Sequence, residues 1–300
     1  MSKPPYLDLA DLLESWCLSL RAERKSAQTL KSYRAGVEQY LTWCADHELP
    51  AVLNRRQVQA WCASLAEAGR EASTVASRQL AVRRFSAWLT AEGEIDADPL
   101  LGLKPPKLDK RVIEPLTEDE LRALLATCKG RDFLDRRDNA LLRFMLETGV
   151  RAGECAALKV SDVDLIRGIA VVRRGKGGKG RIVPIGAQAA QAMDRYRRAR
   201  AQHRLAASDD WWLGDRGKAF TYDGLHKALA QRAASAGIDR FHPHLLRHTA
   251  AHRWLAAGGS EAGLMAVAGW ERPEMLHRYT RARATDRAIA EAQHLNLGEL

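Results

Sequence analysis

Between residues 244 and 279 the sequence contains three short motifs, His244-Leu245-Leu246-Arg247-His248, Gly269-Trp270 and Arg278-Tyr279. Their side chains suit phosphate chemistry. Arginine binds phosphate oxygens, histidine moves protons, an indole N–H donates a hydrogen bond and a tyrosine hydroxyl is a nucleophile. Transfer of a phosphodiester needs charge stabilisation, a nucleophile and a proton for the leaving oxygen. The cluster therefore predicts an enzyme.

Two motifs upstream supply further cations, TGVRAGE over residues 148–154 and GKGGKGR over residues 175–181. We expect Arg151 at the start of a short helix that runs toward Leu158, where helix amides already favour an anion. Lys176 and Lys179 fall in a glycine-rich turn between two strands, where the backbone can come close to a ligand. The spacing alone leaves both lysines as candidates for the proton donor.

His244 and Arg247 are three residues apart in a helix expected from Leu245 to Ala257. They therefore project from nearly the same face, and both can reach one phosphate. His242 and His244 also raise the question of a metal site. No nearby carboxylate or thiol joins them to complete a recognisable ligand set, so no metal is expected.

In this order and spacing, the motifs resemble those of the tyrosine recombinases, the phage integrase and Xer-like family. The resemblance spans about Thr117 to Tyr279, and six residues carry it: Arg151, Lys176, His244, Arg247, Trp270 and Tyr279. Met275, Leu276 and Tyr279 also form an apolar stripe, which by itself would be typical of core packing. The joint pattern of six residues favours a reactive tyrosine.

The resemblance implies which residues form and break bonds. Tyr279 would attack a phosphodiester and form a 3′-phosphotyrosyl link. His244 would accept the tyrosine proton, and Lys176, which the resemblance favours over Lys179, would protonate the 5′ oxygen as it leaves.

The resemblance also implies that Arg151, Arg247 and Trp270 stabilise the pentacoordinate phosphorane. Glu154 matches an acidic position that orients a neighbouring side chain. Trp270 stands where most of the family has histidine, although tryptophan occurs in some members. An indole donates a hydrogen bond but does not exchange a proton near neutral pH, so Trp270 is expected to bind and position.

The composition predicts a polyanionic partner. The 300 residues carry a formal net charge of +10 with a pI near 9.6, and Lys and Arg gain free energy by displacing counterions from nucleic-acid phosphates. The five cysteines lack C-x-x-C or zinc-ligand spacing and are expected to be buried reduced thiols. Without an apolar signal core or a membrane-spanning stretch, the protein is expected to be soluble and cytoplasmic.

Residues 1–103 are expected to form a helical domain. Apolar residues recur at helical spacing and predict four helices, with Ser26 capping the second, Gly69 ending the third and Ser73 or Thr74 capping the fourth. Basic residues on these helices indicate either a DNA-facing surface or a solvated charged face. The DNA-binding candidates are Lys25, Lys31, Arg34, Arg78, Arg83 and Arg84.

Residues 104–114 are expected to form a basic linker because two prolines block helix continuation, and Lys104 and Lys107 are further DNA-binding candidates. The second domain, residues 115–300, should open with a capping box at Thr117. A helix over residues 135–148 and two strands over residues 169–172 and 181–185 should follow. Lys179 and Arg181 in this hairpin complete the DNA-binding candidates. The fold class is mainly α with a small β-sheet.

The resemblance implies a four-helix core-binding (SAM-like) domain and a catalytic domain that close around double-stranded DNA as a C-shaped clamp. The chain would act as a homotetramer on two DNA sites. A last helix over residues 286–295 would dock on a neighbouring subunit or fold back on its own chain. No cofactor, metal or ATP is implied, because the covalent link keeps the bond energy, and an accessory DNA-bending protein is an open partner.

Two other functions fit part of the pattern. A type IB topoisomerase shares the chemistry but relaxes supercoils without pairing two sites. A DNA-binding regulator with an inactive site would bind DNA in a salt-sensitive way and never form a covalent adduct. The complete set of six residues argues against the regulator.

Overall fold

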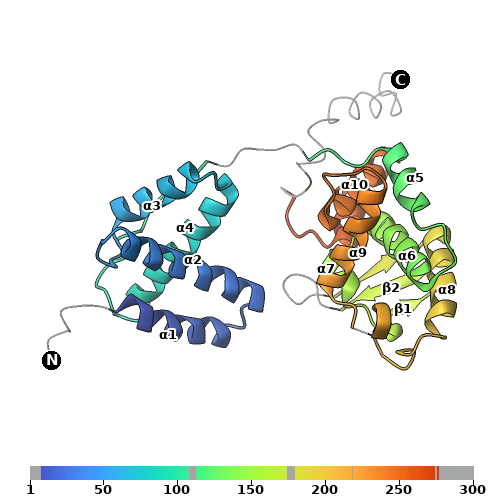
Figure 1. Ribbon diagram of the computed structural model, residues 1–300, viewed down its shortest axis with the longest axis horizontal. Coiled ribbons are helices and arrows are strands. Elements are labelled where there is room, and N and C mark those ends of the chain that lie inside the picture. Colours follow the sequence, from blue (N-terminus) through green and yellow to red (C-terminus); the bar gives the residue numbers. More distant parts are fainter. Residues whose placement is uncertain (1–7, 108–112, 174–179, 218, 274–275, 277–300) are drawn as a thin grey trace, which may run out of the picture. The chain divides into compact units, whose positions relative to one another are not determined.

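The computed structural model describes residues 8–107, 113–173, 180–217, 219–273 and 276. The chain divides into two compact units, Met1–Arg111 and Val112–Leu300 (Figure 1). Each unit has its own hydrophobic core. No helix in the described ranges is long and apolar enough to cross a membrane. All five cysteines are buried and free, as expected.

The first unit contains the four expected helices, α1 (Leu9–Ala22), α2 (Ala27–Asp46), α3 (Arg55–Glu67) and α4 (Ala72–Ala91). Aromatic side chains fill its centre: the Tyr40 ring meets Trp61 edge-on, and Trp16 stacks on Tyr33. Helices α2 and α4 pack closely at Gly36, where an added Cβ would lie 2.5 Å from the Cβ of Ala81. The sequence at this crossing therefore fixes how near the two helices come.

The ends of these helices confirm two of the three expected signals. Ser26 caps α2 by accepting a hydrogen bond from the backbone N–H of Thr29. Gly69, with φ +76°, follows the end of α3 in the left-handed conformation. The expected cap of α4 is wrong: the helix begins at Ala72, so Ser73 and Thr74 lie inside its first turn. Both are exposed there and face water.

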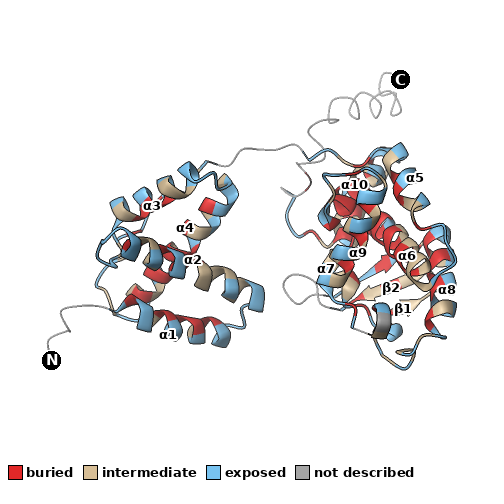
Figure 2. Cartoon of the chain, in the orientation of Figure 1, coloured by how far each residue is buried: buried red, intermediate tan, exposed pale blue. Residues whose placement is uncertain are grey.

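The second unit is mainly helical, with one small sheet. Its helices are α5 (Glu118–Ala126), α6 (Phe133–Thr148), α7 (Ala152–Ala156), α8 (Ala187–Arg200), α9 (Tyr222–Ser235), α10 (Pro243–Ala256) and α11 (Glu261–Ala268), with single 3-10 turns η1 (Val160–Asp162) and η2 (Asp215–Gly217). Helix α6 lies at the centre and packs against α8 and α10. Figure 2 shows the buried residues gathered along α6 and α10.

Helix starts in this unit follow the local chemistry. The capping box at Thr117 is present, with Thr117 and Glu120 satisfying each other's backbone N–H groups. Helix α10 begins at Pro243, two residues before the expected start, because proline suits the first turn of a helix. Helix α7 ends at Ala156 and is shorter than the expected segment toward Leu158.

The sheet contains β1 (Val163–Asp164), β2 (Ile169–Val172) and β3 (Arg181–Pro184), in that order and antiparallel. The last two are the expected strands, and β1 is a short addition. Side chains alternate along β3: Val183 is buried, whereas Ile182 is 61% exposed. Arg181 shares the inward side with Val183, which turns its side chain toward α7 and α11.

Candidate active site

A left-handed turn after α6 builds the first part of the site. Gly149 ends α6 with φ 60° and ψ 21°, a conformation that glycine adopts without steric cost. The chain then extends through buried Val150 and reaches Arg151 at the cap of α7. This turn places the carbonyl of Gly149 and the side chain of Arg151 near one another.

Two arginines anchor on the carbonyls of two left-handed glycines. Arg247 Nη1, from α10, donates to the Gly149 carbonyl at 2.6 Å. Arg151 Nη2 donates to the carbonyl of Gly269 at 3.5 Å, just after α11. The turns that end α6 and α11 therefore hold the cations that the sequence predicts for phosphate binding.

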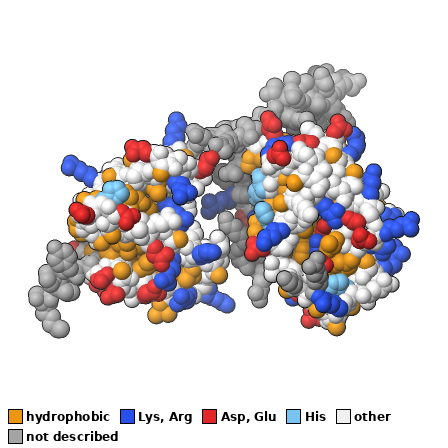
Figure 3. Space-filling model, viewed as in Figure 1, with side chains coloured by type: hydrophobic (Ala, Val, Ile, Leu, Met, Phe, Trp, Pro, Cys, Tyr) orange, Lys and Arg blue, Asp and Glu red, His pale blue; other side chains and the backbone are white. Residues whose placement is uncertain are grey.

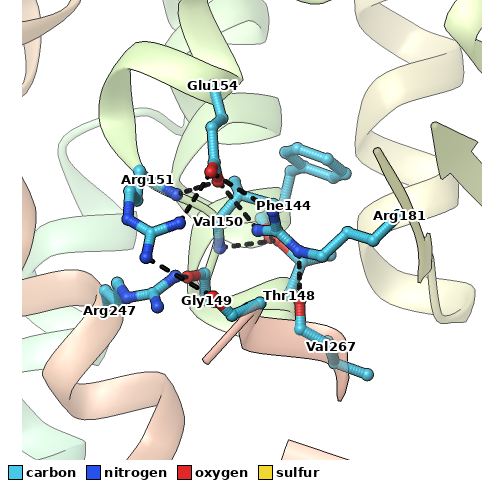
Figure 4. Close-up of polar contacts among 10 residues, drawn as sticks. Phe144, Thr148, Gly149, Val150, Arg151, Glu154, Arg181, Arg247 and Val267 are labelled. Carbon is cyan, nitrogen blue, oxygen red and sulfur yellow. Dashed lines mark hydrogen bonds and ion pairs between the residues drawn. The ribbon is translucent and has the colours of Figure 1, made fainter. Parts of the chain in front are cut away.

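Glu154 accepts hydrogen bonds from two arginines and one backbone group (Figure 4). The Arg151 N–H lies 2.9 Å from Glu154 Oε2, and Arg151 Nη1 lies 2.8 Å from Oε1. Arg181 Nη1 and Nη2 reach Oε1 and Oε2 at 3.2 and 2.8 Å. The orienting role expected for Glu154 is consistent with these contacts.

The pKa of the Glu154 carboxyl reflects this environment. Burial of the side chain, which is 6% exposed, acts to raise the pKa. Hydrogen bonds and charge from Arg181 and Arg151 outweigh burial and leave the pKa below its usual value. Glu154 is therefore an anion at neutral pH.

Trp270 packs against Arg247. The Arg247 guanidinium carbon is 5.1 Å from the centre of the Trp270 ring, within cation–π range, and the two residues are 2% and 5% exposed. The tryptophan thus supports Arg247 through its ring face, a contact that the sequence did not reveal.

His244 is exposed at the start of α10, one turn before Arg247. Its ring meets that of His248 edge-on at 4.8 Å and lies 6.5 Å from that of His242. Burial and the charge of His226 lower the pKa of His242. Within the described residues, His, Cys, Asp and Glu form no group of three or more that could hold a metal ion.

The structure thus brings together three of the six predicted catalytic residues, Arg151, Arg247 and Trp270, with the predicted supporting residue Glu154 and the predicted DNA-binding residue Arg181. His244 lies on the same helix as Arg247. Lys176, Lys179 and Tyr279 fall outside the described residues, as does the expected helix over residues 286–295.

The predicted DNA-binding cations occupy varied settings, and Figure 3 shows Lys and Arg side chains on both units with acidic groups between them. Arg34 pairs with Glu14 and Glu38, and Lys25 pairs with Glu23 at 3.2 Å. Arg78 donates to the Ser32 carbonyl at 3.3 Å. The exposed candidates are Lys25, Lys31, Arg84, Lys104 and Lys107, and Arg83 is half-buried.

Arg181 differs most from its expected setting. Its side chain is 12% exposed and is held by Glu154 and by the Val267 carbonyl, which accepts from Nε at 2.7 Å. The sequence signal for this inward direction was the alternation of β3, since Arg181 is two residues from buried Val183.

Family models match both units of the chain. The family model described as "Phage integrase family" matches residues 114–286, and the one described as "Phage integrase, N-terminal SAM-like domain" matches residues 13–93. The tyrosine recombinase XerC of Pseudomonas entomophila (strain L48) is 33% identical over 81% of this chain and 82% of its own.

Solved structures of recombinases have a similar fold. The crystal structure of XerA recombinase is 27% identical, with a TM-score of 0.54 over 96% of this chain and 99% of its own. A lambda integrase tetramer bound to a Holliday junction shares the fold, with a TM-score of 0.69 at 15% identity over 89% of this chain and 78% of that one. The chain belongs to the phage integrase family of tyrosine recombinases.

Proposed function

We propose that this protein recombines double-stranded DNA at specific sites, cutting and rejoining strands through a covalent link to Tyr279. The observation that carries the proposal is the pair of anchored arginines. Arg151 and Arg247 are far apart in the sequence. Their guanidinium groups donate hydrogen bonds to the carbonyls of Gly269 and Gly149, respectively, which fix their positions. Such fixed cations stabilise charge on non-bridging phosphate oxygens.

The reaction is a transesterification. The Tyr279 oxygen forms a bond to phosphorus as the bond from phosphorus to the 5′ oxygen breaks. His244 takes the proton of the tyrosine hydroxyl, and Lys176 gives a proton to the leaving oxygen. Attack by the 5′ hydroxyl of a second strand reverses these steps and releases Tyr279.

Arg151 and Arg247 stabilise the phosphorane directly, and Trp270 contributes by holding Arg247. The two guanidinium groups take up the charge that develops on the non-bridging oxygens. Trp270 keeps Arg247 in place through its ring face, and Glu154 does the same for Arg151 by hydrogen bonds. Neither supporting residue needs to exchange a proton.

We further propose that four copies act on two DNA sites, with the C-terminal segment from residue 286 joining neighbouring subunits. The lambda integrase tetramer on a Holliday junction, which has the same fold, supports this assembly. The division into a core-binding domain (1–103), a linker (104–114) and a catalytic domain (115–300) belongs to the same proposal. An accessory DNA-bending protein would assist the pairing of sites.

The test is capture of the covalent intermediate. Wild-type protein and the Tyr279→Phe variant are incubated with nicked fragments of DNA from the organism that encodes the protein. The mixtures are denatured in SDS, and the DNA that stays attached to the protein is sequenced. Adducts with wild type alone are expected, and they would identify both the nucleophile and the site. Sequence-specific, salt-sensitive binding without any adduct would favour a regulator instead.

A relaxation assay separates recombination from topoisomerase activity. The protein is mixed at low concentration with a supercoiled plasmid that carries one site. A recombinase that acts as a tetramer on two sites is expected to leave the plasmid supercoiled. Efficient relaxation by single subunits would instead indicate a type IB topoisomerase.

A further inference from the structure

Arg181 connects three elements of the catalytic unit. It lies on β3, both of its terminal nitrogens bind the Glu154 carboxylate of α7, and its Nε donates to the Val267 carbonyl in the last turn of α11. Figure 4 shows the guanidinium groups of Arg181 and Arg151 approaching Glu154 from different sides. A fork with all three donor nitrogens engaged is fixed in orientation.

The contact also changes the charge balance at the site. If Glu154 paired with Arg151 alone, one carboxylate would cancel the charge of one phosphate-binding arginine. Arg181 supplies a second cation to the same carboxylate, so the trio of Arg151, Glu154 and Arg181 keeps a net positive charge. Because these groups are largely buried, water screens this balance weakly.

The third bond reaches the segment that carries Trp270. The Val267 carbonyl that accepts from Arg181 lies two residues before Gly269. A Cβ on Gly269 would lie 3.0 Å from the Arg181 guanidinium carbon, so glycine at this position leaves room for the arginine. Arg181 therefore holds the turn whose carbonyl anchors Arg151.

We propose that Arg181 is a positioning residue, which balances Glu154 and fixes the α11 turn so that Arg151 stays oriented and charged toward the phosphate. The inference rests on the proposed function. In this proposal Arg181 binds Glu154 and the Val267 carbonyl, instead of the DNA contact expected from the sequence.

The test uses Arg181→Gln in the intact chain. At saturating DNA carrying the captured site, the single-turnover rate of adduct formation is expected to fall at least about tenfold, with little change in the Kd for that DNA. Adding Glu154→Gln to Arg181→Gln should recover part of the rate, because it removes the uncompensated carboxylate. A residue that only stabilises the fold would not produce this recovery.

Arg240→Gln is the matched control. Arg240 also grips a glutamate with both terminal nitrogens, Glu120, and also reaches a backbone carbonyl, that of Pro115. Its loss removes an ion pair of the same bonding pattern, although a more exposed one, from the same unit and outside the site. The control should cleave at the wild-type rate within about twofold.

Three results would overturn the inference. They are cleavage by Arg181→Gln at the wild-type rate, a loss confined to DNA affinity, or an Arg151 side chain that keeps its place in a crystal structure of the variant. The crystal structure needs no activity, so it still decides the matter if wild type forms no adduct and the proposed function fails. If Arg181→Gln does not fold, Arg181→Lys takes its place, because it keeps the charge but cannot make all three bonds.

Discussion

Arg247 is buried between the Gly149 carbonyl and the Trp270 ring. Because it stabilises charge that develops only in the transition state, Arg247→Ala is expected to lower the cleavage rate by about a hundredfold or more. The measurement is single-turnover adduct formation, with circular dichroism to confirm folding.

Arg253 provides the control on the same helix. It is exposed and pairs with Glu118 at 3.1 Å. Arg253→Ala should leave the cleavage rate within about twofold of wild type. Near-normal cleavage by Arg247→Ala would contradict its assignment to the phosphate.

The acid role of Lys176 is a second prediction for a single residue. Lys176→Ala should lose most of its cleavage of ordinary DNA, because the 5′ oxygen then leaves without a proton. A substrate with a bridging 5′ sulfur leaves readily without protonation, so the variant should cleave it at nearly the wild-type rate. Lys179→Ala is the companion variant, and a rescue confined to it would move the acid role to Lys179.

The turn that ends α6 is the element that places both arginines. Gly149→Ala puts a Cβ on a residue with φ 60°, while its nearest neighbour, the Ala250 Cβ, would lie at an ordinary 3.6 Å. The strain should cost about 1–2 kcal/mol of unfolding free energy. It should also slow cleavage, because the Gly149 carbonyl anchors Arg247.

Gly237 separates these two effects. It has φ +73° after α9, with no atom within 4 Å of an added Cβ. Gly237→Ala should therefore lose similar stability in urea unfolding but keep its cleavage rate. Equal cleavage rates in the two variants would show that the turn at Gly149 does not position Arg247.

For the whole molecule, the two cores predict independent folding. One core runs from Leu9 to Leu103 and the other from Leu116 to Leu246, with a smaller buried cluster from Ala251 to Leu276, so none of them includes residues of both units. Fragments 1–111 and 112–300 should each show helical circular dichroism and a cooperative thermal transition. An unfolded fragment would show that its core depends on the other unit.

Local sequence was sufficient for most elements. Ser26, Thr117 and Gly149 act within one turn of their helices, so the start of α2, the start of α5 and the end of α6 were predictable. The periodic spacing of apolar residues predicted the four N-terminal helices, and the runs of strand-forming residues predicted β2 and β3. The prediction was wrong or incomplete at two elements whose local sequence signal is weak. Helix α4 begins before Ser73 without the expected cap, and β1, with only two residues, gives too short a pattern.

The sequence by itself determined the family motifs, the two-unit organisation and the residue types suited to a phosphate. Only the tertiary structure decided how these groups are held. Arg151 meets the Gly269 carbonyl across 118 positions, and Arg181 meets Val267 across 86. The periodic spacing of apolar residues predicts helices and strands, which depend on nearby residues in the sequence. The direction of a guanidinium group depends on carboxylates and carbonyls that only packing brings within hydrogen-bonding distance.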